Sequence, residues 1–214
     1  APIRQHIADY FALIAMIDEQ VGRVLDALGA NGLADNTIIV FAGDNGLAVG
    51  QHGLMGKQNL YDHSIRVPLI LAGPGIPAGE CRDARCYLLD IFPTLCDLTD
   101  TPIPDSVEGK SLVPVLKDPS ATRRDVLYFA YMGCQRAVKV GRHKLIEYAV
   151  NGTRTQQLFD LDADPNEINN LAEAAEHKDL LASLRQVLRR WQTDLDDNKE
   201  WGRQFWGANG KSSA

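Results

Sequence analysis

The sequence predicts an α/β fold followed by a smaller antiparallel sheet with a covering helix. Three observations predict it. An apolar helical stripe in residues 10–28 leads into the apolar run of residues 37–42, and a second apolar run follows at residues 67–72. Short strand-like segments begin near Asp125. They are followed by a long amphipathic stretch, residues 171–195, which predicts the covering helix.

The first element is an amphipathic helix that ends at Asn31-Gly32. Apolar residues recur along it at steps of three and four and predict a single buried face. These residues are Tyr10, Ile14, Ile17, Val21, Val24 and Leu28.

Two apolar runs predict strands of the α/β sheet. Thr37–Ala42 is short and rich in β-branched residues, so we expect a strand buried on both faces that ends at Gly43. Val67–Ala72 predicts a second strand, which a Gly-Pro-Gly turn ends. Tyr87–Leu98 predicts a helix with Pro93 in its first turn or at a kink, and the proline-rich residues 101–113 predict a loop.

From residue 123 onward the pattern predicts a second domain, so we divide the chain into residues 1–122 and 123–214. VLYFAYM, QRAVKVGRHKLIEYAV and QQLFDLDAD predict mostly antiparallel strands. Asn151-Gly152-Thr153 fits a glycosylation acceptor, but we interpret it as a turn between strands. The long helix is expected to bury Leu180, Leu184, Val187, Leu188 and Trp191. We expect Trp201, Phe205 and Trp206 to dock the tail, and the group Arg142-His143-Lys144 to lie on a solvated sheet face.

A candidate site follows the first strand. Asp44 and Asn45 come directly after it, at the carboxyl end where open α/β sheets place their ligands. Their adjacent oxygen side chains suit Ca²⁺ or Mg²⁺. Lys57 follows after a short loop and suits an anionic oxygen. A metal site beside a cation indicates a sulfate or phosphate ester as substrate.

Composition limits the other functions. The chain has 214 residues and a formal net charge of −6, so it has no basic field for nucleic acid. No stretch has the length and apolarity of a membrane span. The four cysteines leave two alternatives open, a bridge between Cys81 and Cys86 or free thiols.

Several segments resemble the sulfatase family, within the alkaline-phosphatase-like superfamily. The motifs are DNTIIVFAGDNG, GQHGLMGK and LYDHSIRVPLILAGPGI. DYFALIAMIDEQVGRVLDALGANGL precedes them, and DIFPTLCDLTD, VEGKSLVPVL and QLFDLDADPNEINNLA follow in the family's order. The resemblance runs from about Arg4 to about Leu171. It implies the C-terminal part of an alkaline-phosphatase-like α/β sandwich, followed by a small subdomain made of an antiparallel sheet and a helix.

The resemblance also implies roles for four residues. Asp44 and Asn45 match a pair of metal ligands, usually for Ca²⁺, with Mg²⁺ as an alternative. Lys57 matches the lysine that contacts the sulfate and the ester oxygen, which makes it a catalytic and a substrate-binding residue. His52 lies in the same loop and is a second candidate for substrate binding. His63 and Arg66 either face the mouth of the site or form salt bridges with Asp62 or Glu80.

The family's nucleophile is not in this chain. Sulfatases oxidise the Cys or Ser of a C/S-x-P-x-R motif to formylglycine, and none of the four cysteines has Pro and Arg at the required positions. The family's first Asp-Asp metal pair also has no counterpart before Asp44. We therefore expect an N-terminal half as partner, which brings the formylglycine, and little hydrolysis without it. The substrate class that the resemblance implies is a sulfate ester, including sulfated carbohydrate. The resemblance also favours a periplasmic, secreted or lysosomal location over a cytoplasmic one.

Two alternatives stay open. Phosphodiesterases and phosphonate monoester hydrolases of the same superfamily use a similar metal pair on the same scaffold. A non-catalytic module that binds sulfated glycan or a partner chain is the alternative of another class.

Overall fold

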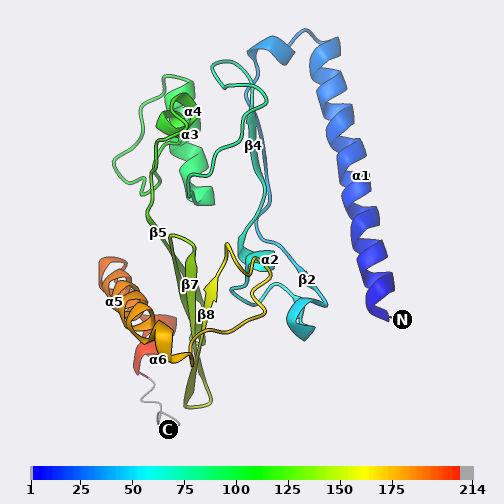
Figure 1. Cartoon of the computed structure of the whole chain (residues 1–214). Coiled ribbons are helices and arrows are strands. Elements are labelled where there is room, and N and C mark those ends of the chain that lie inside the picture. The colour runs from blue at the N-terminus through cyan, green and yellow to red at the C-terminus, as the bar shows by residue number, and fades with distance from the viewer. Residues whose placement is uncertain (1, 208–214) are drawn as a thin grey trace. The chain divides into compact units, whose positions relative to one another are not determined.

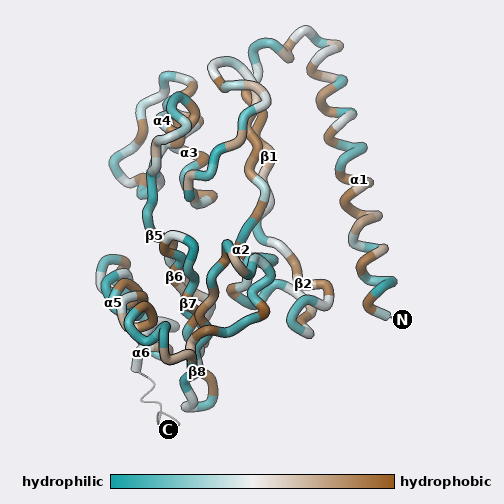
Figure 2. The backbone as a smooth tube through the Cα atoms, in the orientation of Figure 1, coloured by the Kyte–Doolittle hydropathy of each residue, from teal (hydrophilic) through white to brown (hydrophobic). Residues whose placement is uncertain are grey.

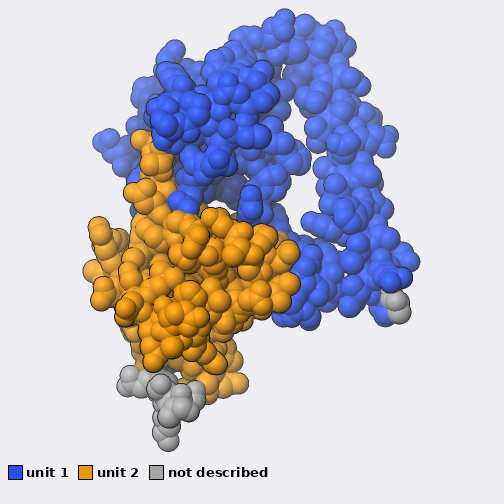
Figure 3. All heavy atoms as spheres, viewed as in Figure 1, with its two compact units in different colours: residues 1–57, 66–121 blue, residues 58–65, 122–214 orange. Residues whose placement is uncertain are grey.

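The computed structural model describes residues 2–207, which form two compact units (Figures 1 and 3). Within the described residues, the first unit comprises residues 2–57 and 66–121, and the second comprises residues 58–65 and 122–207. Among the described residues, no helix combines the length and the apolarity needed to cross a bilayer. Cys81 and Cys86 are not joined by a disulfide bond in this structure.

The first unit consists of helices and two short β-ribbons. Its α-helices are α1 (Pro2–Ala30), α3 (Ile91–Leu98) and α4 (Val113–Lys117), and its 3₁₀ helices are η1 (Ala34–Asn36), η2 (Gln51–Gly53) and η3 (Leu88–Asp90). Its strands are β1 (Ile39–Ala42), β2 (Ala48–Val49), β3 (Met55–Gly56) and β4 (Leu69–Ala72). β1 pairs antiparallel with β4, and β2 pairs antiparallel with β3.

The predicted N-terminal helix and the two predicted strands of this unit are present as α1, β1 and β4, but α1 and β1 are less buried than we expected. We predicted that the first strand is buried on both faces, and this is wrong for the chain itself. Phe41 in β1 is 40% exposed, and no residue of α1 is buried. The physical reason is that, among residues 2–207, β1 pairs with β4 alone, and a two-stranded ribbon this narrow is not covered on both of its faces. Figure 2 shows the apolar residues that recur along α1 and fill β1.

Buried polar residues fix the second half of this unit. Asp90 is fully buried, and its carboxylate accepts hydrogen bonds from the backbone N–H groups of Tyr87 and Lys110, at 2.8 and 2.7 Å. Pro93 lies in the first turn of α3, where it removes no helical hydrogen bond.

The second unit is a four-stranded antiparallel sheet in the order β5-β6-β7-β8, with helices. Its strands are β5 (Val126–Tyr131), β6 (Gln135–Val140), β7 (His143–Val150) and β8 (Thr153–Asp160). Its helices are α2 (Asp62–Ile65), η4 (Ala175–His177), α5 (Lys178–Asp194) and α6 (Glu200–Gly207). The turn between β7 and β8 is made by Asn151 and Gly152, both at positive φ, which confirms the predicted turn.

The sheet of the second unit buries both of its faces. Successive residues of a strand point to opposite faces, so Val138, Leu145 and Leu158 share one face and pack with Leu184 and Leu188 of α5. The opposite face carries Ala137, Ile146 and Phe159, which pack with Leu60 and Tyr61.

Of the three aromatic residues that we expected to dock near the C-terminus, Phe205 and Trp206 do so, whereas Trp201 is 50% exposed. The Phe205 side chain is fully buried, with the guanidinium groups of Arg136 and Arg154 over its ring at 4.9 and 4.8 Å from the centroid. The Asp197 carboxylate accepts hydrogen bonds from Arg136 and from Trp206 Nε1. These contacts attach α6 to the sheet.

Candidate metal and sulfate site

The candidate site begins where β1 ends. The backbone N–H of Gly43 donates to the carbonyl of Pro68 at 3.3 Å, which is the last hydrogen bond beside the β1–β4 pair. Asp44 then turns the chain, and its Oδ1 accepts a hydrogen bond from the backbone N–H of Asn45 at 2.9 Å. Asp44 is exposed and Asn45 is half-buried. Both oxygen side chains therefore lie at a strand tip and are accessible to a ligand.

The short ribbon of β2 and β3 brings Lys57 back to this strand tip. Its register pairs Ala48 with Gly56, so Lys57 leaves the ribbon at the end where Asn45 enters it. Lys57 Nζ donates to Asn45 Oδ1 at 3.0 Å. The amide nitrogen of Asn45 donates to the carbonyl of Gly46 at 2.9 Å, which turns the amide oxygen toward the lysine. An ammonium group and a hard oxygen ligand thus converge.

His52 lies at the other end of the ribbon. It is exposed, within η2 in the loop between β2 and β3, and its backbone is in the left-handed region with φ of 53°. Its role in substrate binding stays a prediction.

The donor set at the strand tip fits a hard cation in type. A carboxylate and an amide oxygen are typical ligands of Ca²⁺, which takes six to eight oxygens. The described part of the chain has no cluster of three or more His, Cys, Asp or Glu side chains that could hold an ion. Asp44 and Asn45 can therefore be part of a metal site, and the other ligands must come from elsewhere.

A buried charged cluster in the second unit was missed by the sequence analysis. We expected Lys144 on a solvated face, and this is wrong: its side chain is fully buried. Lys144 Nζ contacts Asp62 Oδ1 at 2.7 Å and forms an ion pair with Glu167. Lys139 Nζ contacts the other oxygen of Asp62 at 3.2 Å. Alternation along β7 gave a weak signal for this burial, because Lys144 and Ile146 are two residues apart and point to the same face of the sheet.

The charges of this cluster determine the protonation of Asp62. Burial by itself would raise the pKa of the Asp62 carboxyl. The nearby ammonium groups of Lys144 and then Lys139 outweigh burial and hold this pKa below its usual value. Asp62 therefore stays a carboxylate at neutral pH.

Comparison with known proteins identifies the family. The family model for N-sulphoglucosamine sulphohydrolase, C-terminal, matches residues 50–194. The chain belongs to the sulfatase family. This match includes Lys57, the whole β5–β8 sheet and all of α5.

Curated relatives of this sulfatase chain agree with that assignment. It is 34% identical over 207 residues to an N-acetylglucosamine-6-O-sulfatase of Bacteroides thetaiotaomicron, covering 91% of this chain and 37% of the relative. It is 35% identical over 188 residues to an arylsulfatase of Clostridium perfringens, covering 85% of this chain and 39% of the relative. The sulfatase chain thus spans less than half the length of these relatives.

Solved structures share the fold. A protein solved in complex with its substrate D-glucosamine-2-N,6-O-disulfate has a TM-score of 0.80 and 32% identity, covering 88% of this chain and 40% of its own. A phosphonate monoester hydrolase of Agrobacterium radiobacter has a TM-score of 0.73 and 29% identity, covering 85% of this chain and 40% of its own. The predicted fold class, a C-terminal sulfatase portion with an antiparallel sheet and helices, is confirmed.

Proposed function

We propose that this sulfatase chain is the C-terminal portion of a sulfuric ester hydrolase and contributes part of its metal site and a sulfate-contacting lysine. The observation that carries the proposal is the 3.0 Å contact between Lys57 Nζ and Asn45 Oδ1 at the tip of β1. The contact puts a cation and a hard oxygen ligand within reach of one small anionic group. A sulfate ester needs both.

Asp44 and Asn45 would hold the divalent cation, Ca²⁺ or in its place Mg²⁺. Both side chains are accessible, and both offer oxygen. A bound Ca²⁺ supplies Lewis-acid polarisation of the sulfate oxygens. Asn45 also accepts a hydrogen bond from Lys57, which keeps the ammonium beside the ion site.

Lys57 would act on the leaving group. When the bond between sulfur and the ester oxygen breaks, negative charge builds on that oxygen. An ammonium that donates a hydrogen bond to it stabilises this charge more in the transition state than in the substrate. His52, on the loop of the same ribbon, is our candidate for a hydrogen bond to the rest of the substrate.

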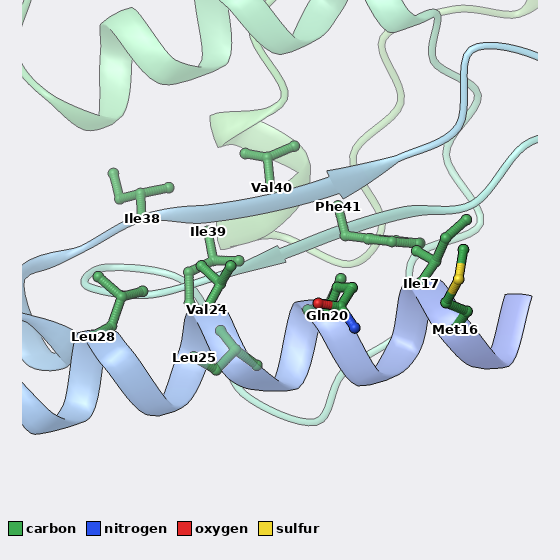
Figure 4. A pocket seen from close by; sticks show the side chains of 11 residues that line it. Met16, Ile17, Gln20, Val24, Leu25, Leu28, Ile38, Ile39, Val40 and Phe41 are labelled. Atoms are coloured by element: carbon green, nitrogen blue, oxygen red, sulfur yellow. The ribbon is translucent and has the colours of Figure 1, made fainter.

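The remaining ligands and the nucleophile would come from an N-terminal half. The chain spans 37% to 40% of the curated sulfatase and the solved sugar-sulfate complex described above. A groove of about 480 Å³ between α1 and β1 supports a missing partner (Figure 4). Its lining is apolar except for Gln20. Figure 4 shows Ile39 and Phe41 of β1 pointing toward α1. Such exposed apolar surface is typical of an interface.

The substrate class that we infer is a sulfated carbohydrate, in particular an amino-sugar sulfate. This rests on the relatives, since one is named an N-acetylglucosamine-6-O-sulfatase and another was solved with a sulfated glucosamine. A phosphonate monoester hydrolase is the second candidate, because two solved hydrolases of that kind share the fold at 27% and 29% identity.

Turnover by the complete polypeptide, in which this chain follows its N-terminal half, tests the proposal. Glucosamine 6-sulfate and aryl sulfates are compared with an aryl phosphonate monoester at equal concentration. The proposal expects kcat/KM for the sulfates to exceed that for the phosphonate. The reverse order would favour the phosphonate monoester hydrolase. If no ester is turned over but sulfated oligosaccharide binds, the chain is part of a binding module.

A further inference from the structure

The sequence contains four Asn-Gly pairs, which begin at Asn31, Asn45, Asn151 and Asn209. In such a pair the backbone nitrogen of the glycine can attack the side-chain amide of the asparagine, because glycine has no Cβ to hinder the approach. Three pairs lie within residues 2–207, and the pair at Asn209 lies outside the described residues. The three described pairs differ in the contacts of their two reacting groups, so the structure distinguishes them.

Among the three described pairs, only Asn45 presents its amide carbonyl to a cation. Lys57 Nζ donates a hydrogen bond to Asn45 Oδ1 at 3.0 Å. Asn45 Nδ2 donates to the carbonyl of Gly46 at 2.9 Å, and the two bonds together determine which atom of the amide faces the ammonium. An ammonium on this oxygen makes Cγ more electrophilic and stabilises the oxyanion that forms when a nucleophile adds to it.

The nucleophile of this pair, the backbone nitrogen of Gly46, is also available. Residues 45–47 belong to no helix or strand. Within the described part of the chain, no group accepts a hydrogen bond from the Gly46 N–H. The bond from Asn45 Nδ2 to the Gly46 carbonyl keeps the side-chain amide beside the residue that must attack it. Such proximity removes part of the entropic cost of ring closure.

The other two described pairs lack this combination. At the end of α1 the backbone N–H of Gly32 donates to the carbonyl of Gly29 at 3.0 Å, and the Asn31 side chain donates to the carbonyl of Ala27 at 2.7 Å. In the turn between β7 and β8, Asn151 is exposed, and its side chain makes no hydrogen bond with the rest of residues 2–207. Asn31 therefore has an occupied nucleophile, and Asn151 has a carbonyl without a cation.

We propose that Asn45-Gly46 is a self-modification site at which Lys57 promotes the deamidation of Asn45. The Gly46 nitrogen loses its proton to hydroxide and forms a bond to Asn45 Cγ. The tetrahedral intermediate breaks its bond to the side-chain nitrogen, which leaves as ammonia with a proton from water and regenerates the hydroxide. Water then opens either carbonyl of the succinimide ring, so aspartate or isoaspartate replaces asparagine. The net reaction consumes water and releases ammonia.

The modification would change the chemistry of the candidate site. It converts the neutral amide of Asn45 to a carboxylate, directly beside the carboxylate of Asp44. Isoaspartate also adds a methylene to the main chain, which moves the new carboxylate. All the residues involved belong to the first unit. The reaction needs only this chain and water, so the inference does not depend on the proposed hydrolase function.

The test follows deamidation of the full 214-residue chain in neutral buffer by peptide mass spectrometry. Chromatography separates the aspartate and isoaspartate products. Asn31 and Asn151 are internal controls in every sample. Lys57→Met removes the ammonium and keeps a side chain of similar length, whereas Lys57→Arg keeps the positive charge. Circular dichroism confirms that each variant is folded, and parallel samples in urea give the rates in the unfolded chain.

We expect Asn45 to deamidate faster than Asn31 and Asn151 in the folded chain. Lys57→Met should slow the reaction at Asn45 by about tenfold, which is less than the effect of an oxyanion donor in a closed active site, because this pair is partly exposed. Lys57→Arg should stay within about threefold of wild type, because it keeps a charged donor. The rate at Asn151 should be the same in all three proteins. In urea, Lys57→Met should have no effect at Asn45.

Three results would overturn the inference. The first is a rate at Asn45 in the folded chain that does not exceed the rate at Asn151. The second is an unchanged rate at Asn45 in a folded Lys57→Met variant. The third is an advantage of Asn45 that persists in urea, because it would assign the reactivity to local sequence and not to the folded contact. If Lys57→Met does not fold, Lys57→Gln, which also lacks the charge, gives the same comparison.

Discussion

Lys57 Nζ and Asn45 Oδ1 lie 3.0 Å apart, although the two residues are twelve positions apart in the sequence. The register of β2 and β3 causes this approach, because it folds residues 48–56 back on themselves. A lysine and an amide in contact on an exposed turn would be an ordinary surface feature. At the carboxyl end of a strand, in a member of the sulfatase family, the same pair is a candidate for recognition of metal and sulfate.

Replacement of Lys57 is the first prediction. In the complete enzyme, Lys57→Ala should lower kcat for aryl sulfates by about 10²–10³-fold, because one donor to the developing oxyanion is lost. Steady-state kinetics at saturating substrate measure this. The matched control is Lys178→Ala, which removes an exposed lysine at the start of α5 and should change kcat little. Equal losses in both variants would contradict the role of Lys57.

Metal binding is the second prediction. Asp44→Ala and Asn45→Ala should each weaken Ca²⁺ binding to the complete enzyme at least about tenfold, because each removes an oxygen ligand. Isothermal titration calorimetry of the chelator-treated protein gives the affinity. Asp105→Ala removes an exposed carboxylate from a loop of the same unit and should leave the affinity as in wild type. Unchanged binding in both site variants would place the ion elsewhere.

The apolar groove gives the third prediction. When this chain and the N-terminal half are made as two polypeptides, Ile17→Glu should weaken their association at least about tenfold, because a charge would be buried without a partner. Light scattering after size-exclusion chromatography measures complex formation. Ile168→Glu is the control, since Ile168 is 72% exposed and lies outside the groove. Association that tolerates Ile17→Glu would mean that the groove is not the interface.

Acid sensitivity is the fourth prediction, and Asp62 and Asp197 carry it. Burial alone would raise the pKa of each carboxyl. The effect of Lys144 on Asp62, and of Arg136 on Asp197, outweighs burial, so folding lowers both pKa values. The pKa of an aspartate carboxyl in the unfolded chain is about 3.9. A carboxyl whose pKa is lower in the folded state stabilises the fold at any pH above that value, and this stability is lost as the pH falls through the pKa of the folded state. The wild-type free energy of unfolding should therefore decrease as the pH is lowered below about 4.

Single replacements of these carboxylates test that explanation. Asp62→Asn and Asp197→Asn should each lower the free energy of unfolding at pH 7 by about 1–3 kcal/mol, and its dependence on pH below about 4 should become shallower. Urea unfolding at several pH values measures both quantities. Asp179→Asn, at an exposed position in α5, should follow the wild-type curve. A variant that is as stable as wild type at pH 7 would contradict the prediction.

The sequence predicted the elements that depend on local pattern. The apolar stripe gave α1, the β-branched run gave β1, and the alternation after residue 125 gave the antiparallel sheet. The contact between Lys57 and Asn45 could be anticipated only as closeness in sequence, because the ribbon register that makes it involves just two pairs. The exposure of Phe41 could not be predicted, since an apolar run does not reveal whether its partner is in the same chain.

The buried charged cluster of Asp62, Lys139, Lys144 and Glu167 was beyond sequence reasoning for a different reason. Lys144 stands beside Arg142 and His143, and a run of basic residues is typical of a solvated surface. Its partner Asp62 lies 82 residues away, and no local pattern links the two. Only the sheet register, which puts Lys139 and Lys144 on one face, makes a buried network possible.

The most direct test of the account is a crystal structure of the complete enzyme with Ca²⁺ and a sulfated monosaccharide. We predict that oxygens of Asp44 and Asn45 lie about 2.3–2.6 Å from the ion, and that Lys57 Nζ is within hydrogen-bond distance of the ester oxygen or a sulfate oxygen. Asp44 and Asn45 turned away from the ion, or Lys57 in solvent with the sulfate bound elsewhere, would contradict it.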